Sequence, residues 1–201
     1  VKGKRCPFKH GGEKRAAFVV DDGIGCHWEQ CAVMTKHGRH DAVKAQLMVE
    51  LAACDATCEV RDEMQVSETG GWVKRVRGKE AAGDRAVADV LTKVKGGLYV
   101  AWDVVVVSVM GAVAAKCAPG VACTSQAHKD KIKHAVEPMR HAHSSSFEAV
   151  AMSTSGYVEP KSRAALLRYV PVAAVHRISA VAALTQARLA AGTFAAIRSS
   201  V

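Results

Sequence analysis

The chain has 201 residues, nearly half of them apolar, which excludes a disordered tail and allows one domain with a sizeable core or two small ones. Ala and Val supply most of the apolar content and aromatic residues only 5%, so such a core depends on close backbone approach or on a partner that completes it. The net charge of +9 favours acidic partners such as nucleic acid or anionic lipid.

Residues 1–24 form a basic segment, rich in Gly near its start, that is predicted to be an extended N-terminal arm. Its cations are expected to contact an acidic partner or RNA, and they include Lys2, Lys4, Arg5 and Lys9. The chain begins at Val1 rather than Met, which agrees with a cleaved organellar transit peptide and equally with a fragment.

Residues 25–66 are predicted to fold as a helical hairpin that turns at Gly38. Asp41 is a good N-cap for the second helix. The apolar residues that follow recur every three or four positions, and they are Val43, Leu47, Leu51, Cys54 and Cys58. Such a stripe predicts one continuous helix over residues 41–63.

This hairpin also holds the densest group of metal-binding side-chain types. Four soft or borderline ligands that suit tetrahedral zinc in kind lie close together in the sequence, at Cys26, Cys31, His37 and His40. An alternative is that two disulfides join Cys26 and Cys31 to Cys54 and Cys58 across the hairpin. A third interpretation leaves these side chains without metal or disulfide, since their spacing differs from that of the common zinc finger.

Residues 72–120 are predicted to contain a short charged helix over 79–95 and then an apolar segment. The run Leu98–Ala115 is bounded by lysines and carries one charge, Asp103. Its length of about 18 residues reaches the lower limit for crossing a bilayer, so a single transmembrane helix at 98–115 is the favoured interpretation. A buried helix is one alternative. A buried strand at 104–109, in an α/β fold, is the other, because four consecutive valines favour strand geometry.

Asp103 is the acid whose pKa is expected to be strongly shifted, because it lies within this apolar run. Two roles are open for it. It is either a proton-relay residue or an acid at a helix end that pairs with a Lys or Arg side chain.

Residues 124–201 are predicted to be a basic helical region that ends in a long Ala/Arg-rich helix, with Pro171 as a kink or boundary. No acidic residue follows Glu159. The segment is therefore expected to dock on an acidic protein surface, an RNA backbone or a membrane headgroup layer. Its contact residues are predicted to be Arg163, Arg168, Arg177, Arg188 and Arg198.

The fold class predicted from these elements is mainly α, and no common catalytic motif is present in the sequence. The favoured function is a non-catalytic structural or accessory subunit of a large assembly, most plausibly a mitochondrial inner-membrane respiratory or ATP-synthase complex. The alternatives are an rRNA-binding structural protein of an organellar ribosome, a viral coat subunit and a zinc-binding module. The expected partners are other protein subunits, membrane lipid or RNA, and zinc is the one cofactor considered.

Overall fold

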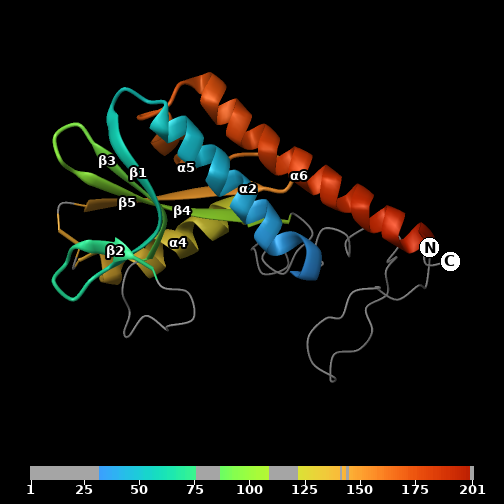
Figure 1. The fold of residues 1–201 in the computed structure, drawn as a ribbon, viewed down its shortest axis with the longest axis horizontal. Helices are drawn as coiled ribbons and strands as arrows, with labels where there is room; N and C mark the ends of the chain where they lie inside the picture. Colours follow the sequence, from blue (N-terminus) through green and yellow to red (C-terminus); the bar gives the residue numbers. More distant parts are fainter. Residues whose placement is uncertain (1–31, 76–86, 109–121, 141, 144, 200–201) are drawn as a thin grey trace.

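The computed structural model describes residues 32–75, 87–108, 122–140, 142–143 and 145–199. They form a five-stranded mixed sheet with helices on both faces (Figure 1). In chain order the elements are α2 (Ala32–Ala52), β1 (Thr57–Val66), β2 (Trp72–Lys74), β3 (Val87–Val94), β4 (Tyr99–Val107), α4 (Cys123–Met139), β5 (Ser145–Ser153), α5 (Pro160–Leu166) and α6 (Val172–Ser199).

The strand order across the sheet is β2-β1-β3-β4-β5. The first four strands are antiparallel to their neighbours, whereas β5 pairs with β4 in parallel. A parallel pair needs a crossover connection, and α4 lies in the connection between β4 and β5. Helix α4 packs on one face of the sheet against β4 and β5.

The larger core lies between the sheet and the helices α2 and α6, which run side by side (Figure 1). Trp102 of β4 is fully buried there, and its indole N–H donates to Thr92 Oγ1 at 3.0 Å. The Tyr169 ring meets Trp102 edge-on at a centroid distance of 5.3 Å. Helix α4 covers the opposite face, so the sheet is the middle layer of three.

The prediction of a mainly α fold with a transmembrane helix at 98–115 is wrong. Residues 99–107 form strand β4 in an α/β fold, and the strand begins well before position 104. Helices cover both faces of the sheet around β4, so side chains on both sides of this strand are mostly apolar. The strand therefore lacks the alternation of polar and apolar residues that marks a strand with one exposed face. Residues 109–115 lie outside the described part of the chain. Among the described helices, none combines the length and the apolar character needed to cross a membrane.

The predicted helix over 41–63 is correct only as far as Ala52. The chain turns at Cys54 and continues as β1, in which Val60 packs in the core on the α2 and α6 side and Met64 in the core on the α4 side. The predicted stripe does not continue past the helix, because its last member, Cys58, is exposed on β1. The predicted hairpin is wrong where it is described, because α2 runs through Gly38 without a turn and is followed by a strand. The predicted helix over 79–95 is also wrong where it is described, since Val87–Val94 is β3.

The predicted boundary at Pro171 is confirmed, because α5 ends at Leu166 and α6 begins at Val172. The predicted arm over residues 1–24 lies outside the described residues.

The free edge of β5 is covered by α5. The buried Ser162 hydroxyl donates to the Ala149 carbonyl at 2.8 Å and accepts the Ala151 N–H at 2.9 Å. These bonds satisfy edge-strand backbone groups that would otherwise lack partners. Helix α5 is thereby fixed beside β5, and its buried Leu166 belongs to the core under α2 and α6.

Candidate active site

Strands β3 and β4 part beside two aspartates. Their register is observed as far as Val90 opposite Trp102, so Asp89 and Asp103 are the next residues on the two strands. The backbone N–H of Val104 donates to Asp89 Oδ2 at 2.8 Å. Both carboxylates are about one-fifth exposed. The parting of the strands therefore places two partly buried acids beside each other near the centre of the sheet.

Asp89 is held by a histidine from the neighbouring helix. His40 of α2 places Nε2 at 2.9 Å from Asp89 Oδ2, and its Nδ1 lies 3.2 Å from Asp41 Oδ1. The hydrogen bond to Asp89 raises the pKa of His40 above 6.5. Burial alone would raise the pKa of Asp89, but the hydrogen bonds from His40 and Val104 outweigh burial and leave that pKa below its usual value. Asp89 is therefore ionised at neutral pH.

The pKa of Asp103 is shifted in the opposite direction from that of Asp89. Burial raises the pKa of Asp103 to about 6, and the nearby Asp89 carboxylate acts in the same direction. Lys131 of α4 opposes this rise, with Nζ at 2.8 Å from Asp103 Oδ1. The expectation of a strongly shifted pKa and of a basic partner is confirmed, although Asp103 lies within a strand and not at a helix end.

A pocket of about 440 Å³ opens between β4 and α4 beside this ion pair. Its lining residues come from these two elements and are Asp103, Val105, Val107, Ala127, Asp130, Lys131 and His134. The pocket thus combines an apolar strand surface with charged groups at one end, as ligand sites commonly do.

A third carboxylate, Glu63, lies in the same row of the sheet on β1. The register pairs Asp62 with Val90 and Met64 with Ala88, which puts Glu63 opposite Asp89. Glu63 has a φ of 49°, the single positive value found for a non-glycine residue in the described ranges. Its Oε1 accepts a hydrogen bond from Lys44 Nζ at 3.1 Å. Backbone strain of this kind concentrates at functional sites, which supports the choice of this part of the sheet as the candidate site.

The two aspartates suit a hard divalent cation. In the described ranges, no group of three or more His, Cys, Asp or Glu side chains gathers closely enough to enclose a metal. Mg²⁺ does not need such a cage, because it keeps several waters and is usually bound by one or two carboxylates together with substrate phosphate oxygens. Asp103 lines the pocket and Asp89 lies beside it, with Oδ1 left as the oxygen that neither His40 nor the Val104 N–H contacts, so the pair suits a cation that shares its ligand sphere with a phosphate.

The zinc ligands predicted from the sequence are only partly described. His40 lies in the candidate site, where it contacts Asp89 and Asp41. His37 belongs to α2, but its side chain is outside the description, as are Cys26 and Cys31. The zinc site remains a prediction.

The other two cysteines of the predicted disulfide pairs are free thiols on different elements. Cys54 lies in the turn after α2, with its Sγ against the Tyr169 carbonyl oxygen, and Cys58 lies exposed on β1. They do not share one helix face as predicted.

Two arginines of the acid-free C-terminal segment are paired with acids on other elements. Arg177 binds Glu50 of α2 through two hydrogen bonds of 2.7 and 2.6 Å, and Arg168 contacts Glu148 of β5. Arg163 and Arg188 are exposed. Arg198 lies in α6 with its side chain outside the description, and the arm cations Lys2, Lys4, Arg5 and Lys9 are outside it as well.

Sequence reasoning missed Asp89 and Lys131 as site residues. The signal for Asp89 was present, because Ala-Asp-Val at 88–90 and Trp-Asp-Val at 102–104 each place an acid inside a strand-forming apolar run. Lys131 gave no comparable signal, since lysines are common on helices.

Comparison of the sequence with protein-family models and with curated proteins gives no match, so the geometry of the site is the basis for any functional proposal.

Proposed function

We propose that this chain is a divalent-metal-dependent phosphodiester hydrolase that cleaves nucleic acid. The observation that carries the proposal is the pair Asp89 and Asp103 on parting central strands, with Lys131 at 2.8 Å from Asp103. Two neighbouring carboxylates, one of which is paired with an ammonium group, would supply both the cation ligands and a positive charge for the phosphate. The chain's net charge of +9 suits a polyanionic substrate.

Asp89 and Asp103 would hold the cation through their carboxylate oxygens. A bound Mg²⁺ or Mn²⁺ supplies Lewis-acid polarisation of the phosphate and lowers the pKa of a coordinated water. The ionised state of Asp89 favours cation binding, and Asp103, with a pKa of about 6, is mostly ionised at neutral pH.

Lys131 and His40 have separate roles in this proposal. Lys131 lines the pocket, so its ammonium group can stabilise the additional negative charge on the phosphoryl oxygens in the transition state. His40 touches Asp89 and acts as a positioning residue that fixes the orientation of that carboxylate.

The reaction adds one water molecule across a P–O bond. The water oxygen bonds to phosphorus, the bridging P–O bond breaks, and the departing oxygen takes up a proton. The products are a phosphomonoester and a free hydroxyl group, so atoms and charge balance without any other reactant.

The test is cleavage of plasmid DNA and of a labelled RNA by the purified chain with Mg²⁺ or Mn²⁺. Asp89→Asn and Asp103→Asn are each expected to lower the cleavage rate at least about a hundredfold. Both variants are also expected to weaken Mn²⁺ binding measured by titration in the absence of nucleic acid.

Asp55→Asn is the matched control, because Asp55 is exposed in the turn before β1 and undergoes the same change of charge. Equal cleavage by all three variants would assign the activity to a contaminant and overturn the proposal. Absence of cleavage of both nucleic acids by the unaltered chain would overturn it too.

The roles predicted from the sequence remain predictions of a different class. They are an accessory subunit of a mitochondrial membrane complex, a ribosomal protein, a viral coat subunit and a zinc-binding module. The first depended on a transmembrane helix at 98–115, and that helix is not formed over residues 99–107.

A further inference from the structure

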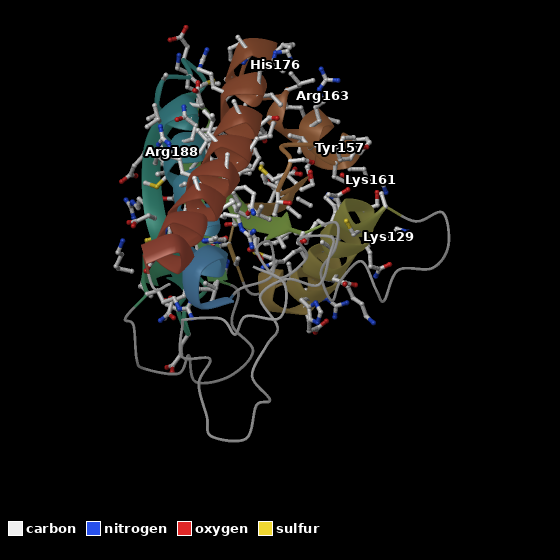
Figure 2. The ribbon with its side chains drawn as sticks, turned by 90° about the vertical axis from the view of Figure 1, so that its right-hand side faces the viewer. Lys129, Tyr157, Lys161, Arg163, His176 and Arg188 are labelled. Atoms are coloured by element: carbon white, nitrogen blue, oxygen red, sulfur yellow. The ribbon has the colours of Figure 1, made fainter. Side chains whose placement is uncertain are left out.

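Three exposed cations without acidic partners in the described ranges lie along the β5 edge of the molecule. Lys129 belongs to α4, and Lys161 and Arg163 belong to α5. Figure 2 shows the three, together with Tyr157, along one side of the molecule, whereas Arg188 lies on the other side of that view. We call Lys129, Tyr157, Lys161 and Arg163 the edge face.

The edge face is built on the two elements that flank β5. Helix α4 packs on the sheet face over β4 and β5, and α5 is bonded to the β5 edge through Ser162. Glu159 fixes the start of α5 by accepting the Ser162 N–H at 2.8 Å. The cations on these helices are therefore held in a defined arrangement relative to the sheet.

The edge face also adjoins the candidate active site. The pocket lining runs along β4 from Asp103 through Val105 to Val107. The Thr154 N–H, in the turn that follows β5, donates to the Val107 carbonyl at 3.0 Å. Tyr157 comes three residues later and is 53% exposed. The far end of the pocket and the turn that carries Tyr157 thus lie at the same end of the sheet.

Three other basic residues of this part of the fold are paired with acids, whereas Lys133, one turn along α4 from Lys129, is exposed and has no ion pair within the described ranges. Arg168 pairs with Glu148, Arg177 with Glu50 and Lys131 with Asp103. Within the described ranges, the cations of the edge face have no such acid beside them, so their charge is available to an external anion. Regularly spaced phosphates are the anions that several separate Lys and Arg side chains can bind together.

We infer that the edge face binds the nucleic-acid strand that enters the catalytic pocket, with Lys129, Lys161 and Arg163 on phosphates and Tyr157 stacked on an unpaired base. This inference rests on the proposed function for the identity of the ligand. It adds the path of the strand and the residues that hold it outside the pocket. An exposed aromatic ring between cations is the combination that single strands use.

The experiment measures binding of a labelled single-stranded oligonucleotide of about 20 nucleotides by fluorescence anisotropy, in EDTA so that no cleavage occurs. Lys161→Gln/Arg163→Gln is compared with the control Lys95→Gln/Arg188→Gln. The control removes two exposed cations elsewhere, one of them in the β3–β4 turn and the other on α6.

The edge double variant is expected to weaken binding and to lower the slope of log affinity against log salt by about 1.5, whereas the control keeps most of both. Lys129→Gln should lower the slope by roughly a further 0.7. Tyr157→Ala is expected to weaken binding at least about fivefold, and Tyr157→Phe should retain affinity because the ring remains.

Equal losses in the edge and control variants would show that only the overall charge matters and would overturn the inference. Failure of the unaltered chain to bind the oligonucleotide at low salt would overturn it as well.

Failure of the inference and failure of the proposed function can be told apart. Asp89→Asn tests cleavage without altering the edge face. Binding that depends on the edge face, with no cleavage in Mg²⁺, would support the binding surface and reject the proposed nuclease activity. Cleavage by the unaltered chain, together with equal binding by both double variants, would support the nuclease proposal and reject the edge face as the binding surface.

Discussion

The ammonium nitrogen of Lys131 lies 2.8 Å from a carboxylate oxygen of Asp103, although 28 positions separate the two residues in the chain. The pair forms because α4 passes back over the strand that precedes it on the way to the parallel strand β5. It partly offsets the burial that raises the pKa of Asp103 to about 6. The crossover connection thus sets the charge state of the candidate site.

Replacement of Lys131 by Gln is expected to lower the rate of nucleic-acid cleavage about a hundredfold, because a positive charge aimed at the phosphate is lost. The acidic limb of the pH–rate profile, expected near pH 6 in the unaltered chain, should also move to higher pH. The reason is that Lys131 lowers the pKa of Asp103 and its removal lets burial act unopposed. Steady-state rates across the pH range check both effects. Lys95→Gln, in an exposed turn, should leave the profile unchanged, and a matching loss in that control would contradict the prediction.

Asp103→Asn is expected to make the fold more stable relative to the unaltered chain as the pH rises. The pKa of Asp103 is about 6 in the folded state, whereas its ordinary value, expected in the unfolded chain, is 3.8. Between these two pH values the folded state therefore binds more protons than the unfolded state. The unaltered chain therefore loses stability from about pH 4 to 6, whereas the Asn variant lacks this term. The difference in free energy of unfolding should grow by on the order of 2 kcal/mol over that window. Urea titrations at pH 4 and pH 7 measure it, and a difference independent of pH would refute the shift.

Ser162→Ala is expected to lower the free energy of unfolding by about 2 kcal/mol or more. The substitution leaves the Ala149 carbonyl and the Ala151 N–H of β5 without their partner in a fully buried position. Thermal or urea unfolding checks the loss. Ser155→Ala is the control, because Ser155 is exposed and contacts only Ser153, and it should cost much less. Similar losses in both variants would remove the special role of Ser162.

Gly156→Ala tests the contact between the β5–α5 turn and α6. Gly156 has a φ of 87°, and an added Cβ would lie 2.7 Å from the Ser179 carbonyl oxygen of α6. Gly97 has nearly the same φ, 86°, but nothing lies within 4 Å of its added Cβ. Both alanine variants carry the backbone strain, so their difference isolates the clash and should be about 1–3 kcal/mol against Gly156→Ala. Equal unfolding midpoints for the two variants would show that the turn at Gly156 moves away from α6 without a loss in the free energy of unfolding.

The local sequence pattern correctly predicted the features that depend mainly on residues close together in the chain. The stripe Val43, Leu47 and Leu51 predicts the buried face of α2, and all three side chains are fully buried. Pro171 marks the break before α6. Burial of Asp103 in an apolar run predicts its shifted pKa. The helix face and the break at Pro171 depend on residues near each other in the chain, so periodicity and composition predict them, whereas Lys131 and Asp89, which also act on the Asp103 pKa, come from other elements.

Tertiary structure alone decided whether Leu98–Ala115 began as a helix or a strand, because an apolar run of this kind satisfies both. Pairing with β3 and β5, with helices over both sheet faces, selected the strand. The candidate site needed the fold even more. His40, Asp89, Asp103 and Lys131 come from four elements, and strand register and the α4 crossover bring them together. The sequence by itself determined which side chains are available, and the long-range packing of the sheet determined which of them meet.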